Sequence, residues 1–177
     1  MTSAEPITAA YLARRSVGPQ WRGFLRAMVE TLDEHLDAEG RAALLRAIGA
    51  RMAAAMPLAH CDRLVDLEAR MNDALAGAEW GFCRLTFDAT SCRLVITHGA
   101  APAVGTVEDS DGGWAGAVLE GVYGAWFAGQ PGADGALRPV LASWSAGEAV
   151  LHYAKDDFCA QRNGRKPVAA PRLFSAS

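Results

Sequence analysis

The segment that most constrains the fold of this chain is residues 113–130, which read GWAGAVLEGVYGAWFAGQ. It has the length of a helix and is apolar on nearly every side. It nevertheless carries glycines at Gly116, Gly121, Gly124 and Gly129. A helix that is apolar all round is usually buried, and each interior glycine costs about 1 kcal/mol relative to alanine. Close approach to another backbone has to recover that cost, so we expect a central helix against which a small sheet or a second subunit packs.

Length and composition are those of one globular domain. The chain has 177 residues, of which 51% are hydrophobic, and domains cluster at roughly 100 to 200 residues. A net charge of -3 offers no broad cationic surface, which argues against nucleic acid as a partner. The sequence lacks an apolar run of membrane-spanning length, and Arg14 and Arg15 follow the mildly apolar start, the reverse of a secretory signal. We therefore expect a cytoplasmic protein with reduced cysteines.

Three segments in the first half have helical periodicity. Apolar residues recur at spacings of three and four over residues 19–36, 41–56 and 62–76. Residues 37–40, which read DAEG, are interpreted as a turn, and Pro57 ends the second helix. Short connections favour antiparallel packing of the three helices.

The period changes to two after Gly77. Residues 80–88 and 91–98 alternate around Ala89 and Thr90, which predicts a β-hairpin. Residues 137–144 and 148–153 predict a second hairpin that turns at residues 145–147. The order is ααα-ββ-α-ββ, an α+β fold with one small antiparallel sheet. We expect a flexible segment over residues 1–18, a single domain over residues 19–154, and a basic, disordered tail over residues 155–177.

The sequence gives little indication of catalysis. It has no phosphate-binding loop after a strand, and its four histidines are scattered over separate elements. His60 and Cys61 are the one adjacent pair of metal-binding type, without a second pair at ligand spacing. Carboxylates of the type used in glycoside hydrolysis are present, but nothing pairs two of them. They are Asp88, Glu108, Asp109, Asp111 and Glu148. We expect no catalytic residue, no metal and no cofactor.

Five tryptophans offer another interpretation, because flat apolar rings stack on glucose units. Trp21 and Trp126 lie on apolar stripes and are expected in the core. Trp80, Trp114 and Trp144 adjoin turns or element ends and are expected to be more open.

Three segments together resemble the cellulose synthase operon protein D family of bacterial cellulose secretion. They are LLRAIGARMA at residues 44–53, WGFCRL at residues 80–85 and VLEGVYGAW at residues 118–126. The resemblance extends over residues 19–154. The longer segment before Pro19 and the basic tail after Ala154 depart from the family pattern.

The resemblance implies a non-enzymatic accessory subunit of cellulose biosynthesis. It implies a cylindrical homo-octamer built from dimers, acting on the inner-membrane cellulose synthase complex, with passageways for nascent β-1,4-glucan that N-terminal segments line. A proline-rich accessory protein is implied as a further partner. Candidate glucan-lining residues are Tyr11, Arg14, Ser16 and Gln20, and candidate oligomer or packing residues are Gly116, Gly121, Gly124 and Trp126.

A second interpretation stays open. The helical first half, the glycine-bearing helix and the closing hairpin at Gly147 and Glu148 also resemble vinyl-reductase-type small-molecule-sensing or adaptor modules. A sensor requires a closed apolar pocket, whereas a scaffold requires a single large assembly.

Overall fold

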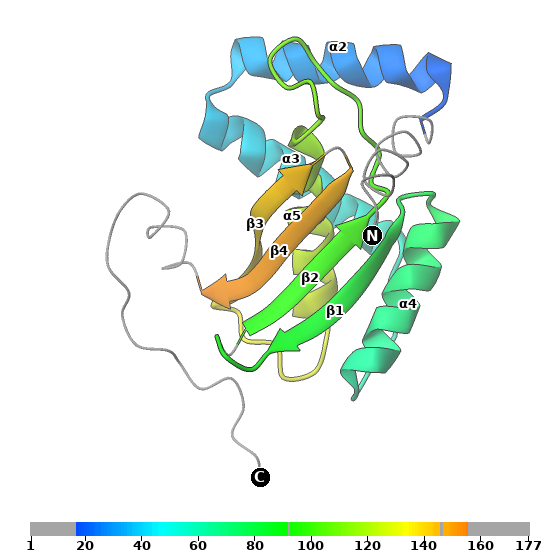
Figure 1. Cartoon of the computed structure of the whole chain (residues 1–177), viewed down its shortest axis with the longest axis vertical. Coiled ribbons are helices and arrows are strands. Elements are labelled where there is room, and N and C mark those ends of the chain that lie inside the picture. The colour runs from blue at the N-terminus through cyan, green and yellow to red at the C-terminus, as the bar shows by residue number, and fades with distance from the viewer. Residues whose placement is uncertain (1–16, 92, 146, 156–177) are drawn as a thin grey trace, which may run out of the picture.

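The computed structural model describes residues 17–91, 93–145 and 147–155, which form one α+β unit (Figure 1). The predicted fold class and the order of elements are confirmed. The elements are α2 (Pro19–His35), α3 (Ala38–Ala55), α4 (Leu64–Gly77), β1 (Phe82–Asp88), β2 (Arg93–Gly99), α5 (Trp114–Ala128), β3 (Leu137–Ser145) and β4 (Glu148–Lys155).

Both predicted hairpins form, and they join edge to edge into one antiparallel sheet with strand order β1-β2-β4-β3. The register pairs Leu85 with Ile96, and Ile96 with Leu151 of β4. Because side chains alternate along a strand, these residues share the inner face, where all three are buried. Leu85 and Ile96 are therefore inward-facing residues of the first hairpin.

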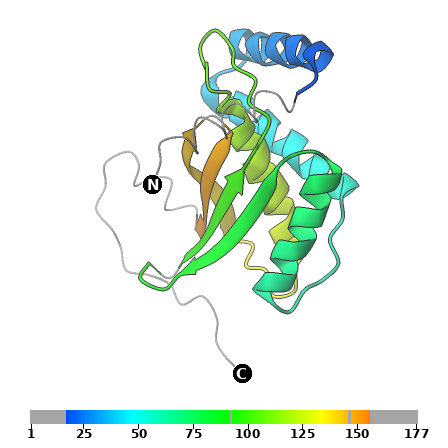
Figure 2. The same cartoon turned by 45° about the vertical axis from the view of Figure 1, so that its right-hand side comes forward.

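Helix α5 is the centre of the molecule. It packs between the inner face of the sheet and α3, so the fold has three layers (Figures 1 and 2). This position explains why the helix is apolar on nearly every side, since both of its long faces are covered. Ten of its residues are buried: Trp114, Ala115, Gly116, Val118, Leu119, Gly121, Val122, Tyr123, Trp126 and Phe127.

The predicted antiparallel packing of the three first helices is wrong for α4. Helix α4 packs along β1 at the edge of the sheet, and α3 takes α5 as its main partner (Figure 2). Asn72 of α4 accepts a hydrogen bond from the Cys83 backbone N–H at 2.7 Å and donates to the Cys83 carbonyl at 2.9 Å. Glu68 accepts the Leu85 N–H at 2.6 Å. These side chains occupy edge groups of β1, which periodicity alone does not reveal.

Two smaller predictions also need correction. Residues 37–40 are the start of α3, because the Asp37 carboxylate accepts the Gly40 N–H at 2.8 Å as an N-cap. Trp21, expected in the core, has 57% of its surface exposed, whereas Trp114, expected to be open, has 4%. The indole of Trp114 donates to the Val104 carbonyl at 2.8 Å, so its polar atom is satisfied inside the protein. Trp126 is buried as predicted.

Candidate functional site

Helices α3 and α5 cross in close backbone contact. A Cβ atom added to Gly121 would lie 2.0 Å from the Arg46 carbonyl oxygen of α3, and one added to Gly49 would lie 2.0 Å from the Val118 carbonyl oxygen of α5. Each glycine thus admits the backbone of the other helix. This is the close approach expected of the glycine-bearing helix, and its partner is a helix of the same chain.

Gly49 was not singled out from the sequence. Leu44, one of the apolar residues at helical spacing in residues 41–56, is 42% exposed. The buried row is Leu45, Gly49 and Ala53, which recur every four residues. Small residues at that spacing on a helix facing another glycine-bearing helix are the signal that identifies this crossing.

The other three α5 residues proposed for packing face the sheet or the end of α3. A Cβ atom on Gly116 would meet the Leu141 side chain at 2.5 Å, whereas one on Gly124 would meet only Pro139 Cδ at 3.6 Å. The Trp126 indole donates to the Met56 carbonyl at 3.0 Å. Any role of these residues in an oligomer stays a prediction.

A glycine also explains the WGF motif before β1. Gly81 has φ +86°, a conformation that side chains with L chirality rarely adopt, and an added Cβ would lie 2.1 Å from the Gly99 carbonyl oxygen. All three segments that carry the family resemblance therefore contain a glycine required by backbone contact: Gly49, Gly81 and Gly121. The glycines in these segments are thus explained by the packing of the fold.

Three polar side chains are enclosed between α5 and the sheet. Tyr123 Oη lies 2.6 Å from His98 Nδ1, and the Cys83 thiol hydrogen-bonds to Tyr123. Burial raises the pKa of Tyr123 well above 10 and lowers the pKa of His98 from 6.5 to about 4. Both side chains are therefore neutral at physiological pH, and the His98 tautomer sets which of the two donates.

The same burial makes this trio poor in reactivity. Burial raises the pKa of the Cys83 thiol from 9.0 to about 11, so the nucleophilic thiolate is disfavoured. Cys83 is 3% exposed, and His98 and Tyr123 have no exposed surface. The trio has residue types found in catalysis but no access for a substrate, and it is best described as a polar network that fixes α5 on the sheet.

The candidate glucan residues fall almost entirely outside the described part of the chain. Tyr11, Arg14 and Ser16 precede residue 17. Gln20 lies in the exposed first turn of α2. The predicted basic tail likewise lies outside the described residues beyond Lys155.

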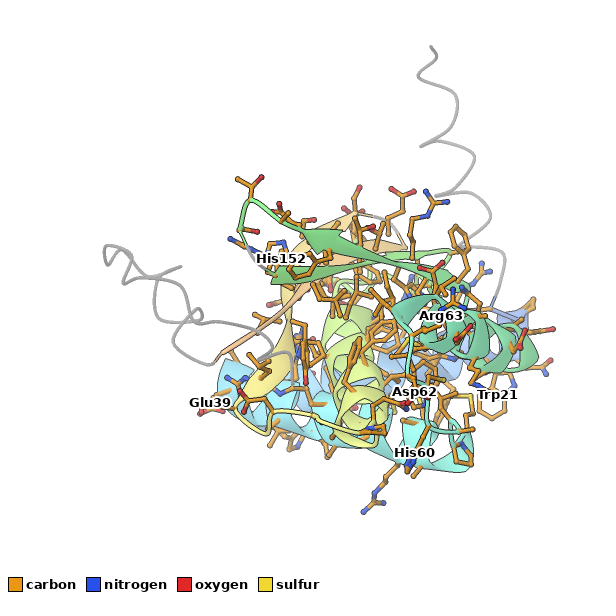
Figure 3. All side chains as sticks on the ribbon, turned by 90° about the horizontal axis from the view of Figure 1, so that it is seen from below. Trp21, Glu39, His60, Asp62, Arg63 and His152 are labelled. Carbon is orange, nitrogen blue, oxygen red and sulfur yellow. The ribbon has the colours of Figure 1, made fainter. Side chains whose placement is uncertain are left out.

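The other residues of catalytic type have structural partners or stand alone. Asp109 accepts the Trp114 N–H at 3.0 Å at the start of α5, and Asp88 accepts the Thr90 N–H at 2.9 Å in the hairpin turn. His60 is exposed, and His152 lies on the sheet, its Nδ1 3.2 Å from an Arg93 guanidinium nitrogen (Figure 3). Over the described ranges, no group of three His, Cys, Asp or Glu residues is placed to hold a metal ion.

A shallow cavity of about 260 Å³ lies between the C-terminal ends of α3 and α5. Ala54, Leu58, Ala125 and Gln130 are among its mostly apolar lining residues. The Gln130 Oε1 atom accepts the Cys61 N–H at 2.9 Å, while its buried Nε2 has no hydrogen-bond partner among the described residues. This cavity is the feature closest to a small-molecule site, although it is below the usual range of about 300 to 1,000 Å³.

Comparison with known proteins decides the family. The family of the cellulose synthase D subunit matches residues 7–154 of the chain. The chain belongs to this cellulose synthase operon protein D family. The match begins ahead of Pro19, so most of the segment that we interpreted as a departure from the family is part of its pattern.

Curated relatives agree with this assignment. The cellulose synthase operon protein D of Komagataeibacter xylinus and that of Komagataeibacter sucrofermentans are each 35% identical to this chain over 117 residues. The aligned region covers 66% of this chain and 75% of each relative. Membership of the family implies a role in bacterial cellulose synthesis, as an accessory subunit associated with the synthase complex. Within the described residues, no helix is long and apolar enough to cross a membrane.

Proposed function

We propose that this chain is a non-enzymatic scaffold that assembles into a homo-octamer built from dimers and guides nascent β-1,4-glucan chains leaving the inner-membrane cellulose synthase. The observation that carries the proposal is the family match over residues 7–154. The cytoplasm is the compartment that we propose, with a proline-rich accessory protein as a further partner.

The described surface supports an assembling protein. Helix α2 exposes more than half of the surface of both Trp21 and Phe24, whose rings contact each other, and contiguous exposed apolar surface is typical of an interaction site. The buried His98, Tyr123 and Cys83 network is closed to substrate. The described residues thus offer an apolar contact surface on α2, and their buried polar network is closed.

Native mass tests the assembly. Light scattering coupled to size-exclusion chromatography should give about eight times the chain mass of 18.7 kDa. A monomer at micromolar concentration would refute the scaffold proposal. Gly121, a candidate oligomer or packing residue, faces α3 of its own chain, so Gly121→Leu would report first on the fold.

Glucan guidance needs its own test. The quadruple alanine variant of Tyr11, Arg14, Ser16 and Gln20 should retain the native mass and lower the yield of crystalline cellulose in a strain that lacks the natural subunit. The matched control replaces His60, an exposed residue outside α2 (Figure 3). Full cellulose yield from the quadruple variant would refute these residues as the glucan lining.

The alternative is a vinyl-reductase-like small-molecule-sensing or adaptor domain, and the cavity at Gln130 is the observation in its favour. A ligand bound there at 100 times its Kd would stabilise the fold by about 2.7 kcal/mol. A thermal-shift panel of lipids and small aromatic compounds should show no such effect. A reproducible shift that Gln130→Leu abolishes would favour the sensor.

A further inference from the structure

Helix α2 leaves part of its circumference without a partner in the described chain. Leu25, Val29 and Leu32 pack on the core, with Val29 fully buried. On one flank of this row, Arg26 Nε donates to the Gly105 carbonyl at 3.0 Å and Glu30 accepts the Val107 N–H at 3.3 Å, which ties α2 to the loop before α5. An ion pair between Asp33 and Arg41 holds the C-terminal end of α2 to α3. These contacts fix the rotation of α2 about its axis.

The other flank of α2 carries a second row, which we call the α2 seam. It consists of Trp21, Phe24, Met28, Thr31 and His35, all exposed except Met28, which is half-buried against the core. The residues follow one another at spacings of three, four, three and four, the a and d pattern of a helix pair. Trp21 and Phe24 are 57% and 56% exposed and stack edge to face with ring centroids 5.8 Å apart. Trp21 lies at the margin of the molecule, far from the sheet face that carries His152 (Figure 3).

The α2 seam contains no lysine, arginine, aspartate or glutamate. The solvent-facing row of a helix in a monomer normally collects such residues. The α2 seam is bulky at its N-terminal end, where the two aromatic rings lie, and carries the smaller Thr31 in its C-terminal half; exposed Ala27 lies beside the middle of the seam. A surface of this shape is complementary to the same surface of a second copy that runs in the opposite direction.

The edges of the sheet, the usual alternative for self-association, are already occupied. Asn72 and Glu68 bind backbone groups of β1. At the other edge the Glu120 carboxylate accepts the Leu141 N–H at 2.7 Å, and Pro139 has no N–H to donate. Addition of a strand from another copy is therefore blocked over these residues.

We propose that the α2 seam is the surface through which two copies of this chain pair, with their α2 helices antiparallel; this inference rests on the proposed oligomeric scaffold. Antiparallel packing lays the aromatic end of each seam beside the narrower end of the other. The opposed helix dipoles favour the same direction.

A membrane surface and the chain's own N-terminal segment are the two other candidate occupants of the seam. A membrane surface attracts helices rich in lysine and arginine, whereas α2 carries two arginines against three carboxylates. Residues 1–16 of the same chain precede α2 and are the other candidate. Measurements of native mass, cross-linking and vesicle binding distinguish both from a second copy.

The test is the native mass of the full chain carrying Trp21→Ala and Phe24→Ala together. The double variant should show at least a twofold lower mass at a concentration at which the natural sequence is fully assembled. Phe82→Ala is the matched control, because Phe82 is also an aromatic residue with 59% of its surface exposed, and its mass should be unchanged. Unchanged far-UV circular dichroism shows that both variants are folded.

Cross-linking gives an independent readout. In a chain whose Cys61, Cys92 and Cys159 are serine, Ala27→Cys should form a disulfide-linked dimer on mild oxidation. Ala128→Cys, exposed at the end of α5, should not.

The outcomes separate this inference from the proposed function. If the natural sequence is a monomer, the scaffold fails and the α2 seam with it. If the natural sequence is an oligomer and the double variant keeps its mass, the α2 seam is not the pairing surface, while the scaffold stands. Binding of anionic vesicles that the double variant abolishes without any change in mass would assign the seam to a membrane. The same mass loss on deleting residues 2–16, with no Ala27→Cys cross-link, would assign it to the chain's own N-terminal segment. Either result overturns the pairing proposal.

Discussion

Replacing Gly121 by alanine should destabilise the fold, although alanine is the better helix former. The added methyl group would lie 2.0 Å from the Arg46 carbonyl oxygen and 3.0 Å from the Ala50 nitrogen. Both atoms belong to the backbone of α3, so no side-chain rotation relieves the clash. Restoring an ordinary contact of about 3.4 Å requires α3 and α5 to separate by on the order of 1 Å.

The magnitude follows from two opposing effects. Overpacking of a rigid core costs typically 1 to 3 kcal/mol, and the upper end applies because the obstacle is backbone. The gain in helix propensity returns about 1 kcal/mol. The net loss is therefore about 2 kcal/mol in the free energy of unfolding, or roughly 8 °C in Tm for a domain of this size.

Gly124→Ala is the matched control, since it lies one turn away on the same helix and its added methyl group meets only Pro139 Cδ at 3.6 Å. It should leave stability unchanged or raise it by up to about 1 kcal/mol. Urea denaturation followed by tryptophan fluorescence, at one fixed protein concentration because assembly adds stability, measures both variants. Equal midpoints for Gly121→Ala and Gly124→Ala would show that the helix crossing is not the rigid contact described here.

Three further predictions concern the sheet and its buried polar groups. Between pH 6.5 and about 4, His98 takes up a proton only when the chain is unfolded, so the free energy of unfolding should fall by about 3 kcal/mol as the pH drops through that window. Urea titrations at several pH values measure this dependence, and His98→Asn should remove it. A thiol-reactive dye at pH 8 should modify half-buried Cys61 and spare Cys83, whose pKa is about 11; peptide mapping that finds Cys83 modified in the folded protein would contradict its assigned burial. Asn72→Ala should cost about 1 to 3 kcal/mol and increase aggregation by uncovering the β1 edge, whereas exposed Asp73→Ala should do neither, as denaturation and light scattering can establish.

The periodicity of the sequence predicted the helices and strands, but it did not predict which of them pack against each other. The change from helical spacing to alternation at Gly77 located both hairpins, because local burial patterns repeat with the geometry of each element. It could not place α4, whose position depends on Asn72 and Glu68 binding backbone groups of β1. Those hydrogen bonds join side chains to another element and leave no period in the sequence.

The same limit applies to the candidate surfaces. The apolar row of α2 predicted a helix correctly, but Trp21 was assigned to the core. The structure divides the large residues of this row between a covered row at Val29 and an open one at Trp21 and Phe24. Periodicity reports that a residue avoids water, and it does not distinguish a contact within the chain from a contact with a second copy. Gly49 was missed for a related reason, since a hydrophobic row gives no weight to a residue without a side chain.

The glycine crossing has a consequence for how sequences of this family vary. Gly49 and Gly121 each face main-chain atoms of the opposite helix, and main-chain atoms are the same whatever residue occupies the facing position. No substitution at one site can compensate a larger residue at the other. The two positions should therefore each be held fixed without covarying, and a method that infers contacts from correlated substitutions would overlook the closest approach in the fold.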